Sequence, residues 1–225
     1  LTENYDKEIL IWDDQYDWAR ERSNNKKGPK PDNFFDLVRK GDLVTLSNSE
    51  SNQRIIQIPP AEAAFVSMNP KNGHIKTYIG GTNFLKTKFD RVRQSFPQTG
   101  SSFKPFIYAS AISRGYDASS LINDAPIIFE DENLEDYWRP ENYTKKFYGL
   151  TRLREALVQS INIVSIKLLR NIGVENVRND LQAFGFEKRR LPSDLSLALG
   201  SSSFSPIEMT RAFSILVNEG KVQEP

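Results

Sequence analysis

Apolar residues in the first 60 positions occur in short runs that are separated by polar stretches. The runs whose length and β-branched or aromatic content predict strands are 8–12, 43–46 and 54–58. Residues 23–33, which contain one glycine and two prolines, predict a loop. This pattern favours a small β-rich module over residues 1–59, and the Pro59-Pro60 pair marks its boundary with residues 60–225.

A β-hairpin is predicted soon after this boundary. Residues 63–68 and 74–79 have the character of strands, and they flank the polar segment 69–73. That segment ends in Asn72-Gly73, which is a strong hairpin signal because both residues tolerate positive φ. His74 opens the return strand, so we expect it to be an exposed hairpin residue.

The pattern becomes helical after residue 100. Ile107, Ala111 and Ile112 continue one apolar face, and Gly115 is a suitable helix end. Pro105 is compatible only with a first helical turn, where its missing N–H leaves no hydrogen bond unmade. The residues just before Pro105 are therefore expected at a helix N-terminus.

Residues 116–149 show no clear periodicity and are predicted to be irregular. Three further helices are expected beyond them. Their apolar positions are Leu153, Leu157 and Val158, then, after a break near Ser160, Val164, Leu168 and Ile172 up to Gly173, and finally Val177, Leu181 and Phe184 up to Gly185. A last helix, to about Asn218, is predicted by the N-cap serine, first-turn proline and capping-box glutamate of Ser205-Pro206-Ile207-Glu208.

Composition narrows the chemistry that the chain can perform. Its 30 Lys and Arg residues and 29 Asp and Glu residues give a net charge of +1, which argues against a strong overall field for nucleic acid or a membrane. The chain has no cysteine, so disulfides, thiol nucleophiles and thiolate zinc sites are excluded. His74 is the single histidine, so a histidine-rich metal site is excluded and a Ser-His-Asp triad would depend on that residue.

The ends of the chain and its apolar runs bear on the kind of protein it comes from. No run reaches the ~18 to 20 apolar residues that span a bilayer. The chain opens at Leu1, not at a methionine, and it breaks off at Pro225 in mid-course. We therefore expect it to be an excised piece of a longer protein.

Ser101 and Lys104 are the first candidates for catalysis. On a helix, residues i and i+3 leave the same face about one turn apart, so the hydroxyl and the amine would converge. A lysine is protonated at neutral pH because its ordinary pKa is near ~10.4, but burial beside a second cation or donor would lower that pKa. The neutral amine could then take the serine proton, as in Ser-Lys acyl transfer.

Taken alone, such a short motif favours a capping serine and a solvated lysine over a catalytic pair. The same Ser-x-x-Lys pattern recurs at Ser23-Asn24-Asn25-Lys26, in a polar loop where nothing would desolvate the lysine. Ser-x-Asn occurs at 23–25, 67–69 and 160–162. Ser160 and Asn162 fall at the break between two predicted helices, where a hydroxyl and an amide could relay a proton and bind a substrate amide, or could simply cap the junction.

Several motifs in one order resemble the transpeptidase domain of a class A, bifunctional penicillin-binding protein. They are Gly100-Ser101-Ser102-Phe103-Lys104-Pro105-Phe106, Trp138-x-Pro140-Glu141-Asn142-Tyr143, Leu153-Arg154-Glu155-Ala156-Leu157-x-x-Ser160-x-Asn162 and Leu195-Ser196-Leu197-Ala198-Leu199-Gly200. The likeness runs from about Ile58 to the end and includes Met68-Asn69-Pro70-Lys71-Asn72-Gly73. Residues 1–59 resemble, more weakly, part of the small OB-like insertion that precedes this domain in some members.

The resemblance implies an α+β fold with a helical lobe and an antiparallel sheet whose C-terminal part is missing. It implies that Ser101 is the acylated nucleophile, Lys104 its general base, Ser160 a proton relay and Asn162 a substrate-binding residue. The substrate would be the D-Ala-D-Ala end of a peptidoglycan stem peptide, and β-lactams would acylate the same serine. No cofactor, metal or nucleic acid is implied.

The family's third motif, Lys-Thr/Ser-Gly on a strand, does not occur, because Lys76-Thr77 is followed by Tyr78 and Lys86-Thr87 by Lys88. The resemblance places that strand in the remainder of the same protein, where it would complete an oxyanion hole whose donors are worth ~3 to 4 kcal/mol each. These 225 residues alone are therefore expected to be inactive. A glycosyltransferase domain and a membrane anchor are expected outside them, at the periplasmic face of the inner membrane in the bacterial cell envelope.

Two other interpretations of the motifs stay open. A serine β-lactamase or a β-lactam sensor uses related motifs, but a β-lactamase also needs a residue that rapidly deacylates the enzyme, and no glutamate is identifiable for that role. A catalytically dead binding or scaffold module would retain the fold and lose covalent labelling by penicillin. The rate of turnover after labelling separates the first from a transpeptidase, and labelling itself separates the second.

Overall fold

The structure, a computed structural model, describes residues 18–20, 22–23, 26–46, 55–57, 61–85, 87–127 and 138–225. The chain divides into two compact units, Leu1–Ala61 and Glu62–Pro225, and each is described by itself. None of the helices in the described part of the chain combines the length and the apolar composition that crossing a membrane requires.

The first unit contains two short antiparallel strand pairs. β1 (Arg22–Ser23) pairs with β2 (Lys26–Lys27), and β3 (Thr45–Leu46) pairs with β4 (Ile55–Ile56). A 3-10 helix, η2 (Phe34–Asp36), lies between the two pairs in sequence.

The strands predicted at 43–46 and 54–58 are confirmed in shortened form as β3 and β4. The loop predicted over 23–33 was wrong in part, because β1 and β2 lie at its start. All four of their residues are polar, so these strands lack the apolar alternation by which a strand is identified in a sequence. The strand predicted at 8–12 lies outside the described residues.

The second unit opens with the predicted hairpin. β5 (Phe65–Met68) and β6 (Ile75–Ile79) pair antiparallel, and Gly73 in the turn has a φ of 76°. The Gly73 amide donates to the carbonyl of Asn69 at 2.9 Å, which closes the turn. His74 is exposed, as its position beside the Asn-Gly pair predicts.

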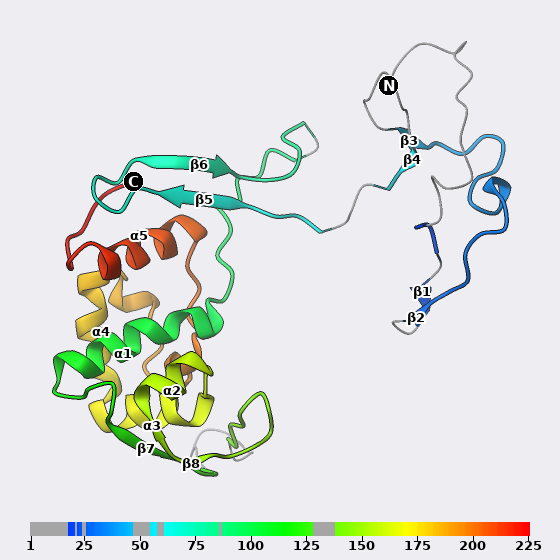
Figure 1. Ribbon diagram of the computed structural model, residues 1–225. Coiled ribbons are helices and arrows are strands. Elements are labelled where there is room, and N and C mark those ends of the chain that lie inside the picture. The colour runs from blue at the N-terminus through cyan, green and yellow to red at the C-terminus, as the bar shows by residue number, and fades with distance from the viewer. Residues whose placement is uncertain are drawn as a thin grey trace. The chain divides into compact units, whose positions relative to one another are not determined.

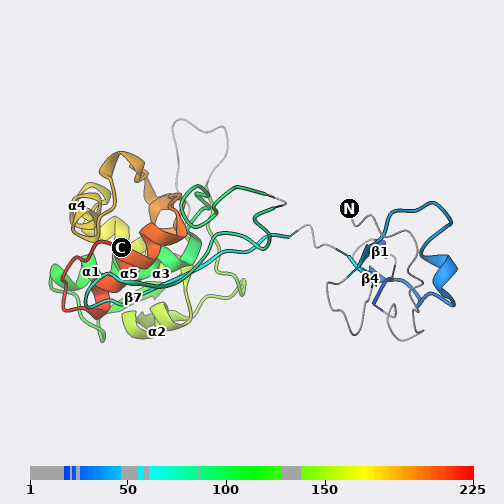
Figure 2. The same cartoon turned by 90° about the horizontal axis from the view of Figure 1, so that it is seen from above.

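Helices make up most of the rest of this unit, and α1 (Lys104–Ser113) lies at their centre (Figure 1). It contacts α2 (Leu153–Val158), α3 (Asn162–Ile172) and α4 (Val174–Asp180), whereas α5 (Pro206–Val217) packs on β5 (Figure 2). The remaining elements are η3 (Gly100–Phe103), β7 (Leu121–Asp124), β8 (Gly149–Arg152), η4 (Leu181–Phe184), η5 (Lys188–Arg190) and η6 (Leu195–Leu199).

A cluster of phenylalanines fills the core beside the N-terminus of α1. Phe103, Phe186 and Phe204 are essentially inaccessible, and their ring centroids lie 4.7 to 6.2 Å apart. Such tilted and offset pairs add about 0.5–1.5 kcal/mol each beyond the area that they bury. The cluster gives η3 and α1 a rigid support.

The predicted apolar faces hold for α1 and α2 except at two positions. Ile107 and Ala111 are fully buried, but Ile112 is 59% exposed and Val158 is 81% exposed, so their assignment to the apolar faces was wrong. Val158 is the last residue of α2, where no later turn covers its side chain. Ile112 lies about 100° around α1 from Ala111, which turns it away from the buried stripe.

The prediction that residues 116–149 are irregular was wrong for β7, and β8 begins at the last residue of that segment. These strands pair antiparallel, with Asp124 opposite Gly149, and β8 leads directly into α2. Each strand has only four residues, and its partner is 25 or more positions away, so no local pattern reveals the pairing. Ile122 and Asp124 point from β7 into the interior.

The helix ends follow their local signals closely. Ser205 caps α5 through the Glu208 amide, Glu208 completes the capping box, and Pro206 occupies the first turn, as predicted. Gly173 and Gly185 end their helical segments with φ values of 92° and 81°, which a residue with a Cβ atom rarely adopts.

Candidate active site

Ser101 lies in η3, which runs without a break into α1 at Lys104. The prediction that Ser101 lies at the N-terminus of the α-helix therefore holds with one refinement, because a 3-10 turn precedes the α-helix. Residues i and i+3 eclipse in a 3-10 helix, so Ser101 and Lys104 lie on one side of it. Ser101 is exposed, and its hydroxyl makes no hydrogen bond to any residue that the structure describes.

Lys104 is the most deeply buried charged side chain of the site, with 1% of its surface exposed. Its Nζ donates to the Ser160 carbonyl at 2.7 Å and to Asn162 Oδ1 at 2.8 Å, and it lies 3.0 Å from Ser160 Oγ. Burial lowers the pKa of Lys104 from 10.5 to about 8, because it penalises the charged form. Three of the candidate residues are thus in direct contact.

The three contacts of Lys104 are chemically unequal. The Ser160 carbonyl and Asn162 Oδ1 can only accept, so each takes one N–H of the amine. The Ser160 hydroxyl can both accept and donate, so this contact persists whether the nitrogen carries a third proton or a lone pair. A proton can therefore pass along it.

Ser160 reaches Lys104 because the chain turns sharply between α2 and α3. Its φ is 54°, in the left-handed region that is uncommon for a residue with a Cβ atom and costs roughly 1–2 kcal/mol. This conformation brings both the carbonyl and the hydroxyl of one residue to the same amine. The predicted helix break therefore places two polar groups of Ser160 in the site.

The first turn of α3 is held from a segment that sequence reasoning gave no role. The N-cap residue Ile161 provides no side-chain cap, and the Asn142 Oδ1 accepts from the amides of Asn162 at 3.0 Å and Ile163 at 3.2 Å instead. Asn162 Nδ2 in turn donates to the Glu141 carbonyl at 2.9 Å. The polar pair Glu141-Asn142, between Pro140 and Tyr143, is the feature of the sequence that could have indicated this role.

A backbone pairing holds the approach to Ser101 on the other side. The Gly100 amide donates to the Gly200 carbonyl, and the Thr99 amide donates to the Ser202 carbonyl, each at 2.9 Å. A Cβ atom on Gly200 would lie 1.9 Å from the Gly100 carbonyl oxygen. Only glycine allows this approach, and sequence reasoning missed it although Gly200 closes one of the quoted motifs.

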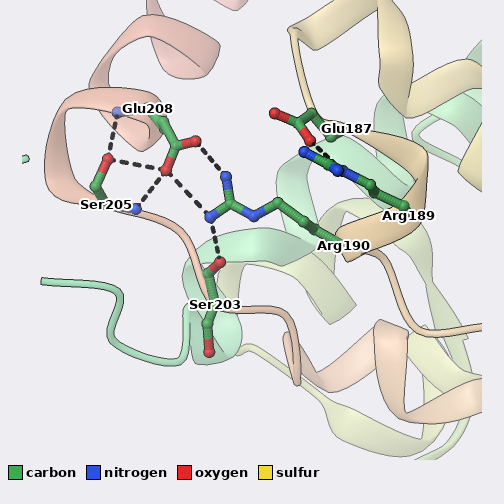
Figure 3. Close-up of polar contacts among 6 residues, drawn as sticks. All are labelled: Glu187, Arg189, Arg190, Ser203, Ser205 and Glu208. Atoms are coloured by element: carbon green, nitrogen blue, oxygen red, sulfur yellow. Dashed lines mark hydrogen bonds and ion pairs between the residues drawn. The ribbon is translucent and has the colours of Figure 1, made fainter. Parts of the chain in front are cut away.

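Arg190 holds the segment that follows this pairing (Figure 3). Its guanidinium donates to both carboxylate oxygens of Glu208, at 2.5 and 3.3 Å, and to the Ser203 carbonyl at 2.8 Å. Its guanidinium carbon, Cζ, also lies 4.4 Å from the ring centroid of Phe204, within cation–π range. Burial works to raise the pKa of Glu208, but the hydrogen bonds from Arg190 and Ser205 outweigh it and lower that pKa.

The other copies of the short motifs lie in different settings. Ser23 and Lys26 are opposite each other in the β1–β2 pair of the first unit, and Lys26 is exposed, so its amine is not desolvated. Ser67 is on β5 and Asn69 closes the adjoining turn. Burial and contacts thus distinguish Lys104, Ser160 and Asn162 from their look-alikes, and Ser101 is distinguished by its place one turn before the buried Lys104.

The assembled groups fit acyl transfer to a hydroxyl. An exposed serine lies one turn from an amine that is partly neutral near pH 8, and a second hydroxyl contacts that amine. Asn162 presents an amide beside them.

Comparison with known proteins agrees with this chemistry. The family described as "Penicillin binding protein transpeptidase domain" matches residues 63–225. Penicillin-binding protein 1A of Pseudomonas aeruginosa is 41% identical over 227 residues, a match that covers 100% of this chain and 28% of that protein. Penicillin-binding protein 1A of Escherichia coli is 35% identical over 209 residues, which covers 92% of this chain and 25% of that protein. The chain thus spans about a quarter of the length of these relatives.

Solved structures share the fold over about three-quarters of this chain. The crystal structure of penicillin-binding protein 1A from Haemophilus influenzae aligns with a TM-score of 0.72 and 38% identity, over 76% of this chain and 26% of that one. The PonA1 protein of Mycobacterium tuberculosis in complex with penicillin V aligns with a TM-score of 0.64 and 25% identity, over 74% of this chain and 46% of that one.

Proposed function

This chain belongs to the penicillin-binding protein transpeptidase family, and from that premise we propose that it forms the acylation site of a peptidoglycan D,D-transpeptidase. Its substrate would be the D-Ala-D-Ala end of a stem peptide. The observation that carries the proposal is the buried Lys104, whose pKa burial lowers to about 8 beside the Ser160 hydroxyl. A lysine in that state is a competent general base near neutral pH.

Ser101 acts as the nucleophile and Lys104 as its base in this proposal. The neutral amine takes the proton from Ser101 Oγ as the oxygen attacks the carbonyl of the penultimate D-Ala. The tetrahedral intermediate collapses, the C–N bond to the terminal D-Ala breaks, and the leaving amine receives a proton. Ser160 relays that proton from Lys104, because its hydroxyl both contacts Nζ and can donate.

The acyl-enzyme is then resolved by a second amine. An amino group from a neighbouring stem peptide attacks the ester carbonyl and loses its proton to Lys104. The C–O bond to Ser101 then breaks, Ser101 Oγ takes a proton back from Lys104, and a new amide cross-link forms. Asn162 binds the amide of the substrate backbone, and its own amide is already oriented by Glu141 and Lys104. A β-lactam presents a strained amide to the same serine, so it acylates Ser101.

The oxyanion hole is the part of the mechanism for which this sequence supplies no Lys-Thr/Ser-Gly motif. We propose that a strand carrying that motif completes it, and that penicillin acylates the 225 residues alone far more slowly than it acylates the full-length protein. We also propose that residues 1–59 are part of an OB-like insertion, with residues 60–225 the N-terminal part of the transpeptidase domain.

The family membership also supports a place in the bacterial cell envelope. We propose that the protein works at the periplasmic face of the inner membrane, held there by an anchor outside these residues. Peptidoglycan stem peptides are accessible on that side, which is the physical reason for the assignment.

Covalent labelling by a fluorescent penicillin tests the proposed function in the full-length protein. Ser101→Ala should abolish labelling, because it removes the attacking oxygen, and mass spectrometry of the wild-type adduct should place the penicilloyl group on Ser101. Ser102→Ala is the matched control. The Ser102 hydroxyl donates to the Thr99 carbonyl, so we expect its removal to leave labelling intact. Undiminished labelling of Ser101→Ala would refute the assignment.

A further inference from the structure

A buried carboxylate and a buried amide lie behind the site. Asp124, at the end of β7, is 0% exposed, and Asn142 is 5% exposed. Asn142 Nδ2 lies 2.9 Å from each oxygen of Asp124 and donates also to the Lys146 carbonyl at 2.9 Å. The mechanism above assigns no role to either side chain, yet burying such groups without a full set of partners is costly.

The partners of Asp124 fix which way the Asn142 amide faces. Among the described residues, Asp124 accepts from Asn142 Nδ2 and from the Tyr148 amide, and both of these groups are donors. A carboxylate can only accept, so the NH2 end of Asn142 must face it. The oxygen end is thereby directed toward α3, where it accepts from the amides of Asn162 and Ile163.

The same reasoning fixes the Asn162 amide one step further on. The Glu141 carbonyl accepts from Asn162 Nδ2, so Asn162 Oδ1 is left to face the Lys104 amine, which donates to it at 2.8 Å. Glu141 and Asn142 thus hold the side chain and the main chain of Asn162, respectively. Asp124 and Asn142 thus fix the first amides of α3, and the Glu141 carbonyl fixes which end of the Asn162 amide faces Lys104.

No other described group replaces this cap. Ile161 has no polar side chain, so Asn142 is the side chain that satisfies the first amides of α3. The preceding residue, Ser160, is in a strained conformation that persists only when its surroundings hold it. The fixed first turn of α3 is therefore also what keeps the Ser160 carbonyl and hydroxyl on Lys104.

We propose that Asn142, anchored by the Asp124 carboxylate, is a positioning residue for acylation: its amide holds the first turn of α3, and thereby Ser160 and Asn162, against Lys104. This inference rests on the proposed function, because it concerns the rate at which Ser101 is acylated. It adds a positioning role for two side chains that do not touch the substrate.

Exchanging the two side chains tests hydrogen-bond polarity while keeping the number of heavy atoms. In the full-length protein, the rate constant for acylation at saturating benzylpenicillin is measured with the melting temperature. Asn142→Ala and Asn142→Asp should each lower the rate about 100-fold, as expected for displaced catalytic groups. Asp124→Asn should lower it about 10-fold, because one of the two oxygens that accept from Asn142 Nδ2 is replaced by a donor.

The double variant Asp124→Asn with Asn142→Asp should recover a rate within about fivefold of the wild type. A carboxylate at position 142 still accepts from α3, and an amide at position 124 donates to it while accepting from Tyr148, so these hydrogen bonds are restored and only the bond to the Lys146 carbonyl is lost. Ile122→Ala is the control for stability, since it opens a cavity beside Asp124 on β7 without touching the hydrogen bonds. It should lower the melting temperature but leave the rate within about twofold.

Three results would overturn the inference. The first is a folded Asn142→Ala protein that is acylated within about twofold of the wild-type rate. The second is an exchange variant that fails to fold or is acylated no faster than Asn142→Asp, and the third is an Ile122→Ala protein that is acylated as slowly as Asn142→Ala. Failure of the proposed function looks different, because the wild-type protein would then carry no penicilloyl group on Ser101. The two proposals are therefore tested separately.

Discussion

The two sides of the candidate site are held in different ways. On the Ser101 side, main-chain atoms hold the chain in place, because Gly100 pairs with Gly200 at a distance that excludes any side chain. On the Lys104 side, the side chains of Asn142 and Asp124 hold the first turn of α3 in place. The first arrangement requires that Gly200 has no Cβ atom, whereas the second requires each hydrogen-bond donor to face an acceptor.

This difference predicts how each side responds to substitution. A backbone pairing has no soft degree of freedom, so an intruding methyl group displaces the whole segment. A network of buried amides tolerates a change of shape only if each donor still finds an acceptor. Substitutions on the Ser101 side should therefore act on stability first, and those on the Lys104 side should act on the rate of acylation first.

Gly200→Ala is expected to have the largest effect on stability. The new Cβ would lie 1.9 Å from the Gly100 carbonyl oxygen and would sit on a residue with a φ of 70°. Backbone must move at both glycines, so we expect a loss of at least about 4 kcal/mol in the free energy of unfolding, or failure to fold. Urea unfolding followed by circular dichroism measures it.

Gly220→Ala separates the steric part of that effect from the backbone strain. Gly220 has a similar φ of 77°, but nothing lies within 4 Å of the position of its Cβ. We expect it to cost only about 1–2 kcal/mol. Equal losses for the two variants would show that the Gly100–Gly200 contact contributes nothing beyond strain.

The titration of Lys104 gives the next largest effect. Its folded pKa is lowered by burial from 10.5 to about 8, so the unfolded chain binds more protons between these values. Stability should therefore rise as the pH rises from about 8 to 10.5, by roughly 3 kcal/mol from this group alone. Below pH 8 the full penalty for charging the buried amine is present.

Two measurements check this prediction for Lys104. NMR of lysine labelled with 13C at Cε should show one resonance with a midpoint near 8, and Lys104→Met should remove it. Lys104→Met should also flatten the rise of stability between pH 8 and 10.5. A lysine midpoint near 10.5 for every resonance would contradict the base role proposed for this residue.

The Arg190–Glu208 pair on the Ser101 side should contribute less to the free energy of unfolding than the titration of Lys104 does (Figure 3). Both side chains are about one-quarter to one-third exposed, so we expect Glu208→Gln to cost about 1–3 kcal/mol and to change acylation less than about threefold. The Glu208 pKa is lowered in the fold, so its stabilisation is present above about 4.5 and is lost as the pH falls through the folded value.

Arg189 provides a matched control for this pair. It lies next to Arg190 and pairs with Glu187, but the two side chains are 84% and 52% exposed. Arg189→Met should change the free energy of unfolding by less than about 0.5 kcal/mol, because solvent screens an exposed ion pair. If Glu208→Gln left the loss of stability below about pH 4.5 as steep as in the wild type, Glu208 would not be the group responsible.

What the sequence predicts well is local in the chain. Ser205 and Glu208 are three residues apart, and their capping box is read directly from that spacing. The Asn72-Gly73 hairpin is equally local. In both cases the residues that interact are close enough in sequence for one pattern to contain them.

The rest depends on pairs that are distant in sequence. Lys104 meets Ser160 across 56 positions, and Thr99 meets Gly200 across 101, and no periodicity encodes either meeting. The family resemblance identified the residues on the Lys104 side, but it left Asn142 without a role and Asp124 unnoticed. A short strand such as β7 and a buried amide become visible only when the whole fold places them together.

Apart from the Arg189 control, the smallest effect on stability is expected at the contact between α1 and α3, on the Lys104 side. The Tyr108 hydroxyl lies 3.2 Å from Ser165 Oγ, and burial raises the pKa of Tyr108 to about 12. Tyr108→Phe removes one neutral hydrogen bond and should cost about 0.5–1.5 kcal/mol, because Ser165 keeps its bond to the Ile161 carbonyl. Urea unfolding measures the loss, and Ser165→Ala in the same background should then cost less than it does in the wild type. Acylation should stay within about twofold, since the bond supports the packing of two helices and not the polarity of the groups around Lys104. A drop as large as that expected for Asn142→Ala would mean that helix packing, not hydrogen-bond polarity, positions this side of the site.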